Sequence, residues 1–156
     1  MDSEKAEMQR FFAVIPAGGI GSRLWPMSRA NAPKFLHDLT GNGQTLLQDT
    51  WDRLQPLANG RTMVVTGDVH ARAVADQLPK LDFANVILEP SPRDSTAAIA
   101  LAAAVLAQRE PDVIIGSFAA DHVISDAQAF HKTVEEAVKV AATGKIVTIG
   151  LSLIHI

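Results

Sequence analysis

The chain contains no cysteine among its 156 residues. A disulfide bond and a thiolate metal site are therefore both excluded, and the composition fits a reducing cytoplasm. There is no excess of basic residues either, because 14 lysines and arginines are set against 17 acidic residues, for a net charge of −3. This balance argues against a nucleic-acid partner bound without regard to sequence.

No apolar run is long enough to cross a bilayer, so we expect no membrane partner. The longest run, around Ala97–Ala107, falls well short of the roughly 20 residues that a transmembrane helix needs. Residues 1–10 are polar and acidic without an apolar h-region, which is not the pattern of a secretory signal, and we expect a polar N-terminal tail there. With 47% hydrophobic and 20% charged residues, the remainder is expected to be one globular domain.

Short apolar runs alternate with longer segments of helical periodicity along the chain. The expected strands lie at 11–15, 63–66, 85–88, 113–118 and 145–149, and the expected helices at 44–57, 70–77, 94–109 and 126–144. This alternation predicts an α/β fold, with a mostly parallel sheet, right-handed crossovers and helices on both faces.

Two of the expected helices carry start signals. Asp94 or Ser95 can cap the third helix, and Asp126 can cap the fourth. The third helix is rich in alanine and apolar nearly all round, so we expect it to be buried.

Three glycines, Gly18, Gly19 and Gly21, follow the first expected strand. Because glycine has no Cβ, the backbone N–H groups of such a loop can approach a bulky anion, which suits phosphate. The dinucleotide fingerprint requires a third glycine where Leu24 stands, and residues 21–23 lack the Gly-Lys-Ser/Thr ending of a P-loop. The loop therefore predicts a phosphate site that fits neither common nucleotide fingerprint.

Cations follow the glycine loop within a short distance. Arg23 can add a bidentate clamp on phosphate. Lys34 stands between Pro33 and the apolar pair Phe35-Leu36, so we expect a positioned rather than a free ammonium group. Arg29 is more typical of a solvated basic surface.

Carboxylates follow two later strands. Asp121, beside His122, could ligate Mg²⁺, which prefers oxygen, or could simply cap a turn. Glu89 could accept both N1–H and N2–H₂ of a guanine, or could simply end its strand. Since the carboxyl ends of parallel strands meet at one edge, we expect the glycine loop, residues 89–94 and residues 120–122 to converge on one rim.

Together these segments resemble the sugar-1-phosphate nucleotidyltransferases. The resemblance covers about residues 11–150 and is carried by residues 16–29, 32–36, 89–100 and 120–124. Trp25, with Pro26 and Ser28-Arg29 behind it, favours the mannose branch over the glucose and thymidylyl branches. The resemblance implies a Rossmann-like nucleotidyltransferase fold. It also implies transfer of GMP from GTP to mannose 1-phosphate, giving GDP-mannose and pyrophosphate.

The same resemblance implies roles for individual residues. Catalysis would depend on Arg23 and Lys34, and Asp121 would hold Mg²⁺ as the cofactor. Asp94 departs from the family pattern, which usually has asparagine at this position. The implied nucleotide-binding residues are Ala17, Gly18, Gly19, Gly21, Ser22, Arg23, Lys34, Glu89, Asp94 and Thr96.

Family members continue well past residue 150, whereas residues 151–156 match nothing in the family pattern. We therefore expect residues 11–150 to be the N-terminal, nucleotide-binding part of a truncated domain, and residues 151–156 to be an atypical apolar tail. Alone, such a chain should bind nucleotide weakly and turn over poorly, and a homo-oligomer is compatible with the pattern. Two alternatives stay open: a non-catalytic nucleotide-binding or regulatory module, and the NAD-binding half of an oxidoreductase.

Overall fold

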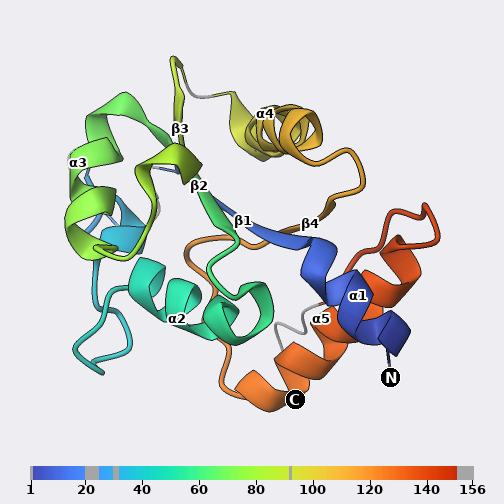
Figure 1. Cartoon of the computed structure of the whole chain (residues 1–156). Helices are drawn as coiled ribbons and strands as arrows, with labels where there is room; N and C mark the ends of the chain where they lie inside the picture. The colour runs from blue at the N-terminus through green and yellow to red at the C-terminus, as the bar shows by residue number, and fades with distance from the viewer. Residues whose placement is uncertain (1, 20–24, 30–31, 92, 151–156) are drawn as a thin grey trace.

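The structure is a computed structural model that describes residues 2–19, 25–29, 32–91 and 93–150 (Figure 1). Helices and strands alternate from the first strand onward. In chain order the elements are α1 (Asp2–Arg10), β1 (Phe11–Ala17), the 3₁₀ turn η2 (Lys34–Leu36), α2 (Leu46–Ala58), β2 (Thr62–Gly67), α3 (Asp68–Gln77), the 3₁₀ turn η3 (Phe83–Asn85), β3 (Val86–Glu89), α4 (Asp94–Arg109), β4 (Ile114–Ser117) and α5 (Ala127–Ala141).

The four strands form one parallel sheet in the order β3-β2-β1-β4. In register, Ala17 of β1 lies opposite Thr66 of β2, and Gly67 lies opposite Glu89 of β3. Because all strands run the same way, their carboxyl ends share one rim of the sheet. The predicted α/β fold with a parallel sheet is confirmed.

Helices cover both faces of the sheet, as predicted (Figure 1). Alternate residues of β1 explain this: Phe11, Ala13 and Ile15 pack in the core with α2, α3 and α5, whereas Phe12 and Val14 pack with α4. A strand buried on both faces is apolar throughout, which is why β1 shows a continuous apolar run rather than alternation.

The winding of the chain changes direction between β1 and β4. From β1 the chain passes through α2, β2 and α3 to β3 at one edge, and α4 then crosses the opposite face to bring β4 beside β1. In open parallel sheets, ligands bind beyond the carboxyl ends of the strands at such a switch point.

The helix starts agree with the predictions in part. Asp126 caps α5, since its side chain accepts a hydrogen bond from the Ala129 N–H. The cap predicted for α4 was wrong: the N-cap is Arg93, whose side chain makes no capping bond, and Asp94 is the first helical residue. Asp94 has a left-handed φ of 62°, so its backbone does not have the extended conformation of a capping residue.

The prediction that α4 is buried was also wrong. Only Ala98, Ala102 and Leu106 are buried, while Leu101 on the far side is 37% exposed. One helix lies over this face of the sheet, and among the described residues no second layer covers its outer side. The exposed alanines on the outer side, Ala100, Ala104 and Ala107, therefore reflect helix propensity rather than burial.

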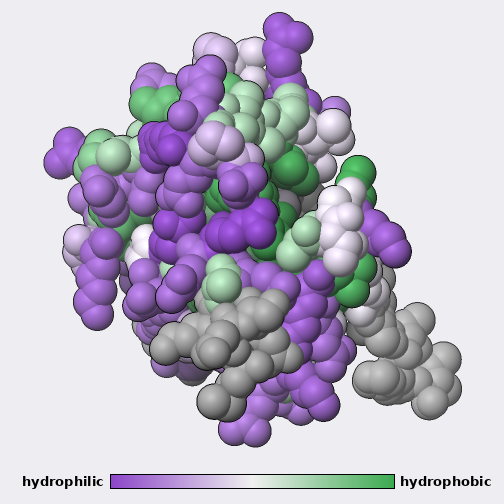
Figure 2. Space-filling view, turned by 45° about the vertical axis from the view of Figure 1, so that its right-hand side comes forward, coloured by the Kyte–Doolittle hydropathy of each residue, from purple (hydrophilic) through white to green (hydrophobic). Residues whose placement is uncertain are grey.

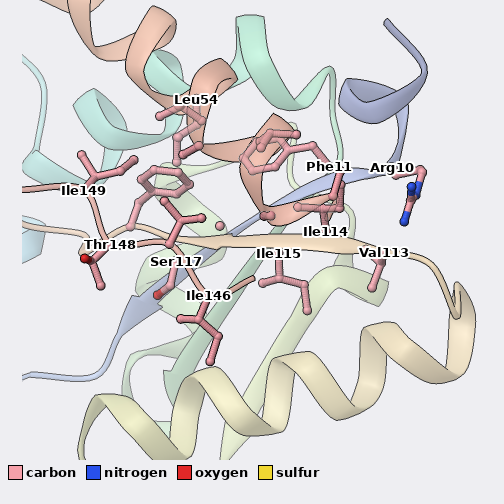
Figure 3. A pocket seen from close by; sticks show the side chains of 18 of the residues that line it. Arg10, Phe11, Leu54, Val113, Ile114, Ile115, Ser117, Ile146, Thr148 and Ile149 are labelled. Carbon is pink, nitrogen blue, oxygen red and sulfur yellow. The ribbon is translucent and has the colours of Figure 1, made fainter. Parts of the chain in front are cut away.

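A fifth strand at residues 145–149 was predicted wrongly. The structure assigns no strand there, and Ile146 is almost fully exposed whereas Ile149 packs on the core. The segment instead lines a cavity of about 720 Å³ beside β4, together with α5 and Leu54 (Figure 3). Strand-like composition shows that a segment suits a pleated surface. It does not supply a neighbouring strand with which the segment could pair.

Exposed hydrophobic side chains are dispersed over the described surface. Trp25, Val69, Phe83 and Ile146 are each largely exposed, and they come from different segments. On the face shown in Figure 2, hydrophilic residues predominate and hydrophobic residues form small separate patches. Among the described residues, no helix has both the length and the apolar character needed to cross a membrane.

His70 of α3 is buried, and its ring packs edge-on against Phe35, so we expect stability to depend on pH through it. Burial lowers the pKa of His70 below its ordinary value of about 6.5. Below pH 6.5 the unfolded chain binds a proton that the folded chain does not, so the free energy of unfolding should fall as pH falls. Chemical denaturation measures the free energy of unfolding at pH 7.5 and at pH 5.5. The drop between the two pH values should be smaller for His70→Leu than for the wild type. An equal drop in both proteins would contradict this prediction.

Candidate active site

Lys34 and Asp121 form an ion pair at the carboxyl rim of the sheet. Their Nζ and Oδ2 atoms lie 3.1 Å apart, and the side chains are 31% and 40% exposed. Lys34 opens η2, which follows β1, and Asp121 lies in the loop after β4. The pair therefore joins the two segments that leave the sheet at its switch point, where a ligand is expected.

Lys34 is held between two buried neighbours, as the sequence indicated. Pro33 and Phe35 are buried on either side of it, and the Leu36 N–H donates to the Pro33 carbonyl at 3.0 Å. His37 closes the turn, since its N–H donates to the Lys34 carbonyl at 3.2 Å. The backbone of Lys34 is thus fixed, while its side chain stays partly exposed and pairs with Asp121.

Gly18 and Glu89 meet at the same rim, on the other side of β1. A Cβ built on Gly18 would lie 3.3 Å from Oε2 of Glu89, so the absence of a side chain lets this carboxylate approach the start of the glycine loop. The Thr66 hydroxyl, which is buried, donates to the Ala17 carbonyl at 2.7 Å and fixes the end of β1 just before the loop.

Asp94 and Thr96 lie exposed at the start of α4. Aspartate and asparagine are the non-glycine residues that best tolerate a left-handed φ. The backbone of Asp94 therefore explains why either of these two residues suits the position, independently of any contact with a nucleotide.

Several expected site residues cannot be placed. Gly21, Ser22 and Arg23 lie outside the described residues, whereas Gly19 is described and exposed. Among the residues that the structure does describe, it brings Lys34 to Asp121 and Gly18 to Glu89. No hydrogen bond joins one pair to the other there.

Two residues that hold the loop of Asp121 were not identified from the sequence. Thr50 and Arg53 of α2 hydrogen-bond to the carbonyls of Ala120 and His122, which flank it. These contacts span about seventy positions of the chain. No local pattern signals them, because both residues have the helical spacing of an ordinary turn of α2.

The carboxylate of Asp121 is the kind of oxygen ligand that a hard cation prefers. In the described part of the chain, no three His, Asp or Glu side chains cluster as metal ligands. Zinc would need three or four protein ligands, whereas Mg²⁺ is commonly held by one or two carboxylates, waters and substrate phosphates. One half-exposed carboxylate could therefore contribute to a Mg²⁺ site only where waters and phosphate oxygens complete the coordination.

Comparison with known proteins agrees with this geometry. The family model described as nucleotidyl transferase matches residues 12–153. The chain belongs to the nucleotidyl transferase family. Among curated relatives of the family, mannose-1-phosphate guanylyltransferase of Salmonella muenchen is 43% identical over 148 residues, covering 92% of this chain and 31% of the relative. Mannose-1-phosphate guanylyltransferase RfbM of Salmonella typhimurium is 44% identical, covering 93% and 31%.

A solved structure shares the fold of this nucleotidyl transferase chain. The crystal structure of mannose-1-phosphate geranyltransferase from Thermus thermophilus is 34% identical and superposes with a TM-score of 0.73, covering 85% of this chain and 38% of that one. The chain spans about a third of the length of the curated relatives that it matches. The resemblance expected from the sequence is confirmed, and the coverage is consistent with an N-terminal portion of such proteins.

Proposed function

We propose that this chain is the nucleotide-binding part of a mannose-1-phosphate guanylyltransferase, which joins GTP and mannose 1-phosphate to give GDP-mannose and pyrophosphate. The Lys34–Asp121 pair at the switch point of the sheet is the observation that carries the proposal. The names of the curated relatives give it further support. The comparisons favour neither the oxidoreductase half nor the regulatory module. A cytoplasmic location belongs to the same proposal and is supported by the lack of cysteine.

The proposed reaction needs charge neutralisation more than proton transfer. The nucleophile is a phosphate oxygen that is already anionic near neutral pH, so no general base is required. The barrier comes from repulsion between two polyanions and from charge on the departing pyrophosphate, which alignment and electrostatics can lower. A site with a fixed lysine, a carboxylate and no histidine–cysteine pair suits this chemistry.

Each residue has a proposed role in this scheme. Lys34 neutralises the β- and γ-phosphates. Arg23 is assigned the same role, from the sequence pattern alone. Backbone N–H groups of Gly18 and Gly19 approach the nucleotide because no Cβ stands in the way. Asp121 holds Mg²⁺, which supplies positive charge at the phosphates when it is bound.

Binding to the 156-residue chain tests the proposal. A ligand that binds only the folded state raises the melting temperature, so millimolar GTP with Mg²⁺ should raise it, and NADH should not. A chimera in which residues 1–150 replace the matching segment of the Salmonella typhimurium relative should form GDP-mannose and release pyrophosphate. A folded chimera without activity, together with a chain indifferent to GTP, would exclude the proposal.

Glu89 is the proposed reader of the base. A carboxylate can accept from both N1–H and N2–H₂ of guanine, whereas adenine offers no such pair of donors. Glu89→Gln should therefore reduce the preference for GTP over ATP by about tenfold or more, since one charged hydrogen bond contributes about 1.5–3 kcal/mol. Calorimetric titration with both nucleotides measures the ratio, and an unchanged ratio would show that Glu89 does not select the base.

A further inference from the structure

The turn that carries Asp121 is tied to α2 on both sides of the aspartate. The Thr50 hydroxyl donates to the Ala120 carbonyl at 3.4 Å, and Nη2 of Arg53 donates to the His122 carbonyl at 3.0 Å. The same Nη2 donates to the Thr50 hydroxyl at 2.9 Å, so the two tethers form one connected group. Asp121 is thus the middle residue of a turn whose flanking carbonyls are both fixed.

Arg53 is itself held from several directions. Its guanidinium lies 5.6 Å from the centre of the Phe130 ring of α5, in a cation–π arrangement. Its backbone carbonyl accepts a hydrogen bond from Nε2 of His131 at 2.7 Å, which joins α2 to α5 at the same point. Burial lowers the pKa of Arg53, with Asp49 opposing the shift, yet an arginine so placed stays charged.

The rim above this group is comparatively weakly held. A half-exposed ion pair such as Lys34–Asp121 contributes at most about 1 kcal/mol and cannot by itself fix the loop. The cavity beside β4 extends beneath the same loop, because Thr50, Arg53 and His122 are among its lining residues. The loop thus has open space beneath it, and the tethers from α2 hold it from that side.

We propose that Arg53 is a positioning residue that fixes the backbone of the Asp121 turn, so that the carboxylate faces Lys34 and a nucleotide-bound Mg²⁺. This role deepens the proposed function and rests on it. Arg53 acts through the His122 carbonyl and the Thr50 hydroxyl, and it makes no hydrogen bond to the side chains of Lys34 or Asp121.

Arg61 offers a matched control at the opposite end of the sheet. It too is partly buried, donates to a backbone carbonyl (Phe11, 3.0 Å) and lies over a phenylalanine ring (Phe12, 5.1 Å). Its ion pair with Glu110 lies just before β4 begins, away from the rim that carries Asp121. Arg61→Met should therefore cost stability, as Arg53→Met does, without touching the site.

The experiment compares Arg53→Met, Arg61→Met and the wild-type chain. Calorimetry gives the GTP dissociation constant over a Mg²⁺ titration, and ¹⁵N relaxation gives backbone order parameters for residues 119–123. Arg53→Met should raise the Mg²⁺ concentration for half-maximal effect about tenfold, as loss of groups that orient a metal ligand does. GTP binding in EDTA should not weaken, because Lys34 keeps its charge when the turn of Asp121 loosens. Order parameters at Asp121 and His122 should fall from about 0.85 to about 0.6.

The outcomes separate this role from the proposed function. An Arg53→Met chain that matches Arg61→Met in both readouts would overturn the role. If wild-type GTP binding shows no Mg²⁺ dependence, the proposed function fails, and the order parameters alone then decide whether Arg53 holds the turn. Should Arg53→Met fail to fold, Arg53→Lys and Thr50→Val carry the test, with smaller changes in the same direction supporting the role and none overturning it.

Discussion

Replacing Gly116 with valine is expected to lower the free energy of unfolding by about 3 kcal/mol or more, a large share of the total for a domain of this size. Gly116 pairs with Ala13 in the centre of the β1–β4 ladder. A Cβ there would lie 2.7 Å from Cε2 of Phe118 and 2.8 Å from Cε2 of Phe11. These rings cannot simply move aside, because Phe11 is fully buried and Phe118 packs edge-on against both Phe11 and Phe130.

Denaturant titration of four variants checks this expectation. Gly116→Ala should cost about 1–3 kcal/mol, less than valine, because a single methyl group has to be fitted. Gly19→Ala is the matched control for stability, since a Cβ there meets nothing within 4 Å. Adding Phe118→Leu to Gly116→Ala should recover part of the loss. Gly116→Val with wild-type stability would mean that the rings rearrange freely.

The elements that local pattern determines were predictable from the sequence. β1 is apolar over its whole length because both of its faces are buried, and Asp126 caps α5 with a side-chain oxygen three residues before the bonded N–H. Lys34 between Pro33 and Phe35 is a similar case, because the two buried neighbours are adjacent in sequence. Such signals need no knowledge of distant residues.

Features that depend on partners far along the chain were not predictable. Residues 145–149 have strand-like composition, but a strand requires a neighbour in register, and composition does not supply one. The alanines of α4 indicate a helix without saying which side another layer covers. Arg53 is the clearest case at the site: its acceptor at His122 lies 69 positions further along the chain, so only the assembled structure brings them together.

Asp121→Asn is expected to change GTP binding in opposite directions with and without Mg²⁺. With Mg²⁺, loss of the carboxylate should weaken binding by about a hundredfold, the upper end of the range seen when groups that only orient a metal ligand are removed. In EDTA, binding should tighten instead. The variant frees Lys34 from its ion pair and removes a negative charge close to where the phosphates are proposed to lie.

A change in GTP affinity that reverses direction between Mg²⁺ and EDTA distinguishes a metal ligand from an aspartate with a structural role. Asp112→Asn removes an equal charge at the other end of β4, from an exposed position, and should leave binding unchanged under both conditions. Lys34→Met should weaken binding with and without Mg²⁺, because its charge acts directly on the phosphates. Since an exposed pair contributes at most about 1 kcal/mol, the melting temperature of Asp121→Asn should change little. Equal losses for Asp121→Asn with Mg²⁺ and in EDTA would show that this carboxylate holds the loop rather than a metal ion.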